Sequence, residues 1–255
     1  MKKRILAHII LWYSVLCFFG CSSNVSLENA DIHAGLKNYN ITHCSIEQIG
    51  DYKNIPIAAV SPDKVTDQEI EEELESLKEE EGTIDDDYVK EHYQDEGLTS
   101  VKEWKEYIRK SNEDINKSMV QEENLDKRYD WLIDHSEFQI DTDEIAEYSL
   151  SIVQSAEANV GLFGCNSLKE YYTDYLHIDK DTFYNNCYEE GLRTIERFLV
   201  IGAIANQEEI EILQSELEDY CKENKEEIED LSKSAKQNVT FDLLLEKVDE
   251  YLSDD

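Results

Sequence analysis

The sequence predicts an all-α fold: an elongated multi-helix domain with helical arms and a short extended N-terminal segment. The first observation is the scarcity of turn residues, since the 255 residues include only 2 prolines and 9 glycines. The second is that apolar residues recur at helical spacing through long stretches that lack both proline and glycine. The third is a hydrophobic content of 40%, which is enough to bury a core despite a charged content of 33%.

Residues 1–20 are predicted to be a lipoprotein signal peptide. A positively charged start is followed by an apolar run, Ile5–Phe19, and then by Gly20 directly before a cysteine. The run is shorter than the ~20 residues that a helix needs to cross a membrane. We expect lipid attachment at Cys21 and a place on the extracytoplasmic face of the bacterial cell membrane. Phe18 stands where lipoprotein signals prefer leucine, so an uncleaved N-terminal anchor is the open alternative.

Residues 21–46 are predicted to be a flexible tether, because they are mostly polar and show no sustained periodicity. The helical domain is expected over residues 47–255. It begins with an extended arm, Ile49–Val65, in which apolar residues alternate and both prolines occur. Because an extended segment has no helical hydrogen bonds of its own, we expect it to lie against another element.

Two capping boxes mark the first two helices. Thr66 and Glu69 have the spacing of such a box, and Gly82 is expected to end the helix that they open. Ser100 and Glu103 have the same spacing and open a stretch of about 34 residues without proline or glycine, which corresponds to a helix of ~50 Å. Its apolar positions are Val101, Trp104, Ile108, Ile115, Met119, Leu125, Tyr129 and Leu132.

The remaining helices are predicted from the same signals. Asp141 and Glu144 are expected to start a third helix, which Gly161 ends. A shorter helix in SLKEYYTDYL and a longer one from about Asp181 are expected to form the tip of a hairpin. After a short extended piece, Ile210–Leu213, another helix follows, and FDLLLEKVDEYL is predicted as the closing amphipathic helix.

The net charge of -35 limits the classes of partner. Such a surface repels phosphate backbones, so nucleic-acid binding is not expected. A solvated, self-repelling exterior that keeps the protein soluble is the favoured interpretation of the charge.

The residues that usually carry chemistry do not form recognisable sites. None of the six cysteines lies in a CxxC pair or in a zinc-ligand spacing, so neither a metal nor another cofactor is expected. The histidines form no HExxH motif, and no GxSxG, P-loop or GxGxxG is present, so no catalytic residue is assigned. In an exported protein, disulfides among Cys44, Cys165, Cys187 and Cys221 are possible, with the pairing left open.

Several strings, taken in order, resemble trigger factor, the bacterial chaperone. They are IGDYKNIPI followed by VTDQEIEEELESLKEE, then TIDDDYVKEHYQDEGLTSVKEWKEYIRKS, HSEFQIDTDEIAEY, TFYNNCYEEGLRTIERFLVIGAIANQEEIEI and FDLLLEKVDEYL. The resemblance spans about Ile49 to Leu252 and implies the helical, substrate-cradling C-terminal domain of that family. The chain departs from the family in two ways. After Lys78 it leaves no room for the prolyl-isomerase domain, and the ribosome-docking region is missing.

The resemblance, together with the predicted signal peptide, implies an exported, membrane-anchored chaperone that binds unfolded or newly translocated polypeptides through a helical cradle and performs no catalysis. The expected partners are unfolded or secreted polypeptides and the membrane, through the lipid anchor, but neither nucleic acid nor the ribosome. A prolyl isomerase, by family association, and an adaptor lipoprotein that holds one folded partner are the alternatives. Core packing is the rival interpretation for each candidate client-binding residue: Tyr148, Ile152, Leu162, Phe163, Tyr171, Tyr172 and Tyr175.

Overall fold

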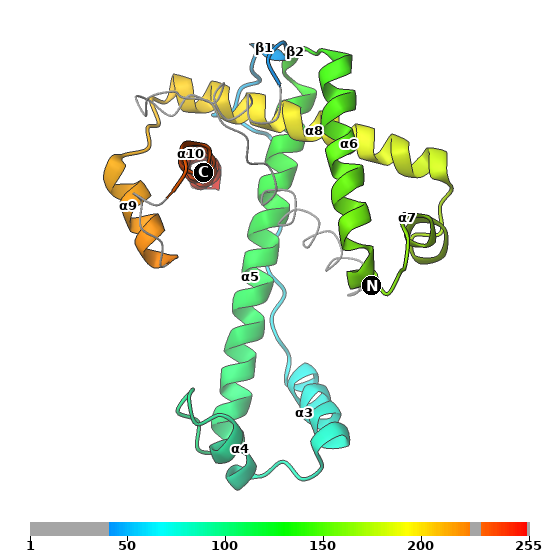
Figure 1. Ribbon diagram of the computed structural model, residues 1–255. Helices are drawn as coiled ribbons and strands as arrows, with labels where there is room; N and C mark the ends of the chain where they lie inside the picture. The colour runs from blue at the N-terminus through cyan, green and yellow to red at the C-terminus, as the bar shows by residue number, and fades with distance from the viewer. Residues whose placement is uncertain (1–40, 225–230, 254–255) are drawn as a thin grey trace. The chain divides into compact units, whose positions relative to one another are not determined.

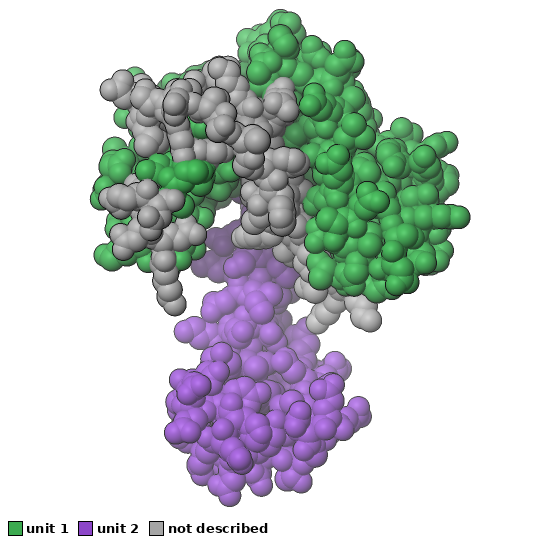
Figure 2. Space-filling model, in the orientation of Figure 1, with its two compact units in different colours: residues 1–55, 129–255 green, residues 56–128 purple. Residues whose placement is uncertain are grey.

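The computed structural model describes residues 41–224 and 231–253, and the chain divides into two compact units (Figure 2). Unit 1 comprises residues 1–55 and 129–255, and unit 2 comprises residues 56–128. Within the described part, helices dominate and the only sheet has two short strands, so the predicted all-α class is confirmed (Figure 1). The predicted signal peptide and Cys21 lie outside the described residues.

Unit 2 contains α3 (Asp67–Glu81), α4 (Asp86–His92) and the first part of α5 (Val101–Asp134). The predicted capping box of α3 is confirmed. The Glu69 N–H donates to Thr66 Oγ1 at 3.3 Å, and the Thr66 N–H donates to the Glu69 carboxylate at 2.8 Å. The helix ends at Gly82, whose φ of 90° is a conformation that favours glycine.

The core of unit 2 is a small cluster of buried apolar side chains contributed by each of its helices. Leu74 comes from α3, Ile84 from the connection, Val89 from α4 and Trp104 from α5. Tyr93 lies edge-on to the Trp104 ring, with the ring centroids 6.4 Å apart. The short helix α4 is therefore held by packing, since seven residues are too few for a stable isolated helix.

The predicted length of α5, 34 residues, is confirmed. The Glu103 N–H donates to Ser100 Oγ at 3.3 Å, as the predicted cap requires. The Glu103 carboxylate also accepts from the N–H and the hydroxyl of Thr99, both at 2.7 Å, and its hydrogen bonds with Thr99 and Ser100 lower the pKa of its carboxyl group. Thr99 therefore adds two donors to the predicted pair of Ser100 and Glu103.

Unit 1 contains the sheet, in which β1 (Ser45–Gln48) pairs antiparallel with β2 (Glu137–Gln139). The sequence places residues 41–46 in the tether, but in the structure they belong to the fold. Ile41 and Cys44 are buried, and β1 has already begun at residue 45. Polarity alone misplaced this boundary, because the apolar residues that anchor the segment are too few to produce a periodic pattern.

The rest of unit 1 consists of two connected helical pairs. The first pair is α6 (Thr142–Asn159) and α8 (Lys180–Gln207), joined by the turn η1 (Val160–Phe163) and by two short helical segments. Helix α6 ends at Asn159, two residues before the predicted stop at Gly161, and the chain continues as the turn η1 to Gly164, the left-handed glycine with φ 72°. The second pair is α9 (Gln214–Glu223) and α10 (Lys233–Ser253).

Helices α6 and α8 approach each other closely at Gly191. A Cβ atom at this position would lie 2.5 Å from Ser149 Oγ and 3.5 Å from Ser149 Cα. Ser149 is buried, and its hydroxyl donates to the Ile145 carbonyl at 2.7 Å, so it is not free to turn away. This contact requires small residues on both helices.

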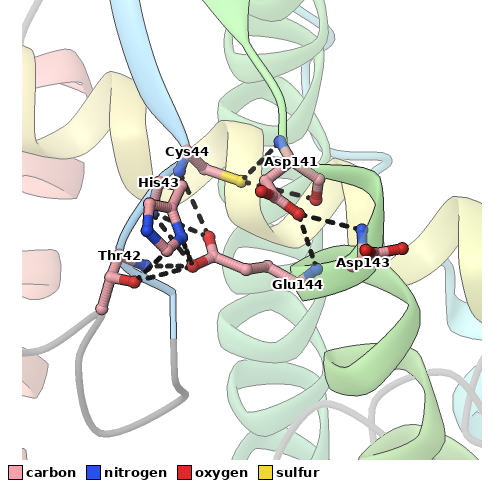
Figure 3. A network of polar contacts seen from close by, with 6 residues as sticks. All are labelled: Thr42, His43, Cys44, Asp141, Asp143 and Glu144. Atoms are coloured by element: carbon pink, nitrogen blue, oxygen red, sulfur yellow. Dashed lines mark hydrogen bonds and ion pairs between the residues drawn. The ribbon is translucent and has the colours of Figure 1, made fainter.

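A network of polar contacts attaches residues 42–44 to the start of α6 (Figure 3). The Glu144 carboxylate accepts the backbone N–H groups of Thr42, His43 and Cys44 at 2.9, 3.0 and 3.2 Å, and it also contacts His43 Nδ1 at 2.7 Å. Burial alone would raise the pKa of Glu144, but the hydrogen bonds that His43 and Thr42 donate outweigh it and lower that pKa from 4.5 to about 2.

We expect Glu144→Gln to lower the free energy of unfolding by about 2 kcal/mol at neutral pH, because a neutral amide accepts these N–H groups more weakly than a carboxylate does. The pKa of Glu144 is lowered in the folded protein, so the stabilisation is present above the unfolded value of 4.5 and is lost as the pH falls toward about 2. Urea denaturation of both proteins at pH 7 and about pH 3 measures the difference. An undiminished difference at about pH 3 would contradict the assignment. Glu157→Gln, an exposed change on the same helix, serves as the control.

Gly191→Ala is expected to destabilise unit 1 by about 1–3 kcal/mol, because the new methyl group meets Ser149 Oγ. In the Ser149→Ala background the oxygen is gone and alanine is the better helix former, so the same change should be close to neutral. Denaturant unfolding of the two single variants and the double variant measures this coupling. If the destabilisation of the double variant equals the sum of the destabilisations of Gly191→Ala and Ser149→Ala, the contact between residue 191 and Ser149 Oγ does not limit the packing of α6 against α8.

Candidate functional site

Six aromatic rings lie at the end of the α6–α8 hairpin, and we call this group the tip cluster. Figure 1 shows the segment that carries it, between the end of α6 and the start of α8. The rings form a continuous series of contacts, with centroid distances between 4.9 Å for Phe163–Tyr171 and 6.2 Å for Tyr171–Phe183. The members are Phe163, Tyr171, Tyr172, Tyr175, Phe183 and Tyr184.

Local hydrogen bonds explain how the sequence SLKEYYTDYL produces this arrangement. Ser167 Oγ accepts the Glu170 N–H at 3.2 Å and starts the short helix α7 (Leu168–Glu170). The chain then widens into a π-helical turn, η2 (Tyr171–Tyr175), in which the Leu176 N–H donates to the Tyr171 carbonyl at 2.9 Å. In this turn the Tyr171 and Tyr175 rings stack, with centroids 5.6 Å apart.

Part of the tip faces solvent, and we call this part the tip surface. Leu162, in the turn η1, has 70% of its surface exposed, the largest fraction among the described large apolar residues. The other exposed members are Tyr175, Leu176 and Tyr184. Two of these side chains rest on buried rings, since Tyr175 stacks on Tyr171 and Tyr184 lies edge-on to Phe183.

The seven residues predicted from the sequence fall into three groups. Tyr148, Ile152 and Tyr171 are buried, so their side chains pack inside unit 1 and are not available to a partner in this structure. Phe163 and Tyr172 are partly buried, and Leu162 and Tyr175 are exposed.

The residues predicted from the sequence do not include two exposed members of the tip surface, Leu176 and Tyr184. The signal for Tyr184 was present: Phe183 and Cys187 form the buried stripe of α8, which leaves Tyr184 on a different face of the helix. Leu176 has no such signal, because its exposure follows from the π-helical turn that precedes it.

Four carboxylates belong to the same segment of the chain as the tip surface, on Glu170, Asp174, Asp179 and Asp181. Asp179 caps α8 by accepting the Thr182 N–H at 2.8 Å, and this hydrogen bond lowers the pKa of its carboxyl group. The same segment carries two lysines, Lys169 and Lys180, and Lys180 Nζ lies 5.3 Å from the centroid of the Tyr184 ring. Charge in the same segment keeps such a surface hydrated.

The cysteines of the described part are free thiols, so none of the pairings among Cys44, Cys165, Cys187 and Cys221 is formed. Burial raises the pKa of Cys187 to about 11 and also raises that of Cys44, which disfavours the nucleophilic thiolate. Residues 41–224 and 231–253 contain no group of His, Cys, Asp or Glu side chains suited to holding a metal ion. Among the described helices, none is both long and apolar enough to span a bilayer.

Comparison with known proteins identifies one family. The model of the bacterial trigger factor protein (TF) C-terminus matches residues 100–229, slightly more than half of the 255 residues. The match begins at the cap of α5 and includes α6, the tip cluster, α8 and α9. Neither the curated proteins nor the solved structures yield a match. Because the family model covers α5, α6, the tip cluster, α8 and α9, more than half of the chain, the chain belongs to the family of the trigger factor C-terminal domain.

Proposed function

We propose that this protein is an exported, membrane-anchored chaperone that holds unfolded or newly translocated polypeptides at the tip surface without catalysing a reaction. Membership of the trigger factor C-terminal family supports a chaperone-like role. The observation that carries the finer proposal is the exposure of Leu162 and of Tyr175, whose ring stacks on the buried Tyr171, within the region that the family model matches.

The chemistry of the tip surface suits a client without fixed sequence. An unfolded chain offers scattered apolar side chains, and each large one that leaves water on binding contributes about 1.5–3 kcal/mol before the costs of association. A few such contacts give weak, reversible binding. The carboxylates of the same segment keep the empty surface soluble and contribute no directional recognition of a particular sequence.

Export and anchoring rest on the sequence of residues 1–21. Attachment through Cys21, or through an uncleaved N-terminal anchor, would hold the protein where polypeptides emerge from the membrane. An inserted prolyl-isomerase domain is not part of the proposal, because residues 82–85 alone connect α3 to α4. The ribosome is likewise not part of the proposal.

The double variant Leu162→Ser/Tyr175→Ser should bind a denatured client about tenfold or more weakly, since two exposed apolar contacts worth about 1 kcal/mol each are removed. Client binding is measured as suppression of the aggregation of chemically denatured citrate synthase. Light scattering follows the aggregation over a range of molar ratios of this protein to the client. Leu213→Ser is the matched control, because Leu213 is another exposed leucine of unit 1 outside the tip. Equal suppression by all three proteins would reject the tip surface as the binding site.

Cys21→Ser should abolish the incorporation of labelled fatty acid when the full chain is expressed in a bacterium, because the cysteine thiol is the point of lipid attachment. Labelling combined with the mass of the purified protein measures both lipidation and processing. A wild-type protein that stays in the membrane fraction, unlabelled and with residues 1–20 retained, would show the uncleaved anchor. A wild-type protein found in the cytoplasm would contradict export.

A further inference from the structure

In unit 2, residues 56–65 run beside α5 as a straight segment that contains no helix, turn or bend (Figure 1). The segment is attached to α5 at Val60 by two hydrogen bonds. The Val60 N–H donates to Asn124 Oδ1 at 2.7 Å, and Asn124 Nδ2 donates to the Val60 carbonyl at 2.9 Å. One carboxamide therefore holds both backbone groups of one residue, as a facing residue does in an antiparallel pair of strands.

This attachment sets the direction of the neighbouring backbone groups. In the β conformation, the N–H and the carbonyl of one residue point to the same edge, and those of the adjacent residues point to the opposite edge. Because the groups of Val60 face α5, those of Ala59, and of Ile57 two residues before it, face away from the helix. Among the described residues, the backbone groups of Ile57 and Ala59 have no hydrogen-bond partner. These two residues thus form a short strand edge, which we call the open edge.

The sequence limits the open edge and leaves it uncharged. Both prolines of the chain, Pro56 and Pro62, flank it, and a proline cannot donate to a strand ladder. The alternation also shifts at Pro62, since the next carbonyl that α5 holds is that of Asp63, which accepts from Asn116 Nδ2 at 3.3 Å. Proteins commonly protect an exposed strand edge with charged side chains. Residues 54–62 carry none, although 33% of the chain is charged.

The open edge is accessible to another chain. The side chains of Ala58, Ala59 and Val60 are exposed, and that of Ile57 is partly buried. The alanine side chains are single methyl groups, so a second backbone can come as close as the strands of a sheet do. Because α5 already holds the segment, little ordering of residues 56–65 accompanies the binding of a partner strand.

We propose that Ile57 and Ala59 form a β-addition site, at which an extended, uncharged stretch of another polypeptide pairs with the open edge. The pairing uses the N–H and the carbonyl of both residues, so it selects an extended backbone and tolerates most side chains. A second copy of this chain offers the same edge, but a net charge of -35 on each copy opposes their approach. The site lies outside the tip surface, and it rests on the proposed function only for the source of the bound chain, since an unfolded polypeptide carries unpaired backbone groups.

Two neighbouring substitutions by proline test the open edge. Ala59→Pro removes an N–H that faces away from α5, whereas Ala58→Pro, the matched control, removes one on the opposite edge. Neither N–H has a hydrogen-bond partner within the part of the chain that the structure describes. The probe is a fluorescein-labelled peptide of about six alternating valine and threonine residues, the length of an ordinary strand, and fluorescence anisotropy follows its binding. Ala59→Pro should bind it about tenfold more weakly than the wild type, and Ala58→Pro should bind it within about twofold of the wild type.

Methylated probes make the same test on the wild-type protein. Adjacent residues of a strand face opposite edges, so methyl groups on two adjacent nitrogens block both edges of the probe. Methyl groups on two nitrogens that lie two residues apart block one edge and leave the other intact. The first probe should bind at least about fivefold more weakly than the second. The inference is overturned if the two methylated probes bind equally, or if Ala58→Pro and Ala59→Pro bind the probe alike.

The tip variant Leu162→Ser/Tyr175→Ser should bind the probe as the wild type does, which separates this inference from the proposed function. Probe binding that Ala59→Pro weakens, without any suppression of client aggregation, supports the site and rejects the chaperone. Suppression of aggregation without such probe binding supports the chaperone and rejects the site. A wild-type dimer in analytical ultracentrifugation that Ala59→Pro converts to a monomer would also overturn the inference, because a second copy then covers the open edge.

Discussion

A buried hydroxyl–carboxylate contact joins the parts of unit 1 that are distant in sequence. The Tyr129 hydroxyl donates to Asp249 Oδ1 at 2.6 Å, which links the last turns of α5 to α10. The Arg197 guanidinium of α8 lies 4.1 Å from the centroid of the Tyr129 ring and 3.9 Å from the same carboxylate. Tyr129 is almost fully buried, so its hydroxyl needs this partner, and loss of the partner leaves a desolvated polar group.

Helix α8 connects this contact to the tip cluster. Its C-terminal half carries Arg197, and its first turn carries Phe183 and Tyr184. Between them, Gly191 allows the close approach of α6 that places the two ends of the tip segment side by side. The exposed side chains of the tip thus belong to a closely packed hairpin. The packing holds these apolar side chains in fixed, solvent-exposed positions.

Sequence patterns predicted the features that depend on neighbouring residues. The Thr66–Glu69 capping box, the stop at Gly82 and the unbroken length of α5 all arise within a few turns of one helix. The patterns failed where distant segments meet. The pairing of Ser45 with Gln139 and the attachment of residues 42–44 to Glu144 depend on which distant residues the fold brings together. At the candidate site, helical spacing placed the aromatic residues at one tip but could not separate the buried Tyr171 from the exposed Tyr175, because a π-helical turn sets their orientation.

The burial of Cys187 and Cys44 has a consequence for the redox chemistry of these two thiols. Disulfide exchange proceeds through the thiolate, and a thiol with a pKa of about 11, as at Cys187, is almost entirely protonated at neutral pH. Burial also raises the pKa of Cys44. These two sulfur atoms are therefore slow to form mixed disulfides with the cysteines of any other polypeptide that meets the protein.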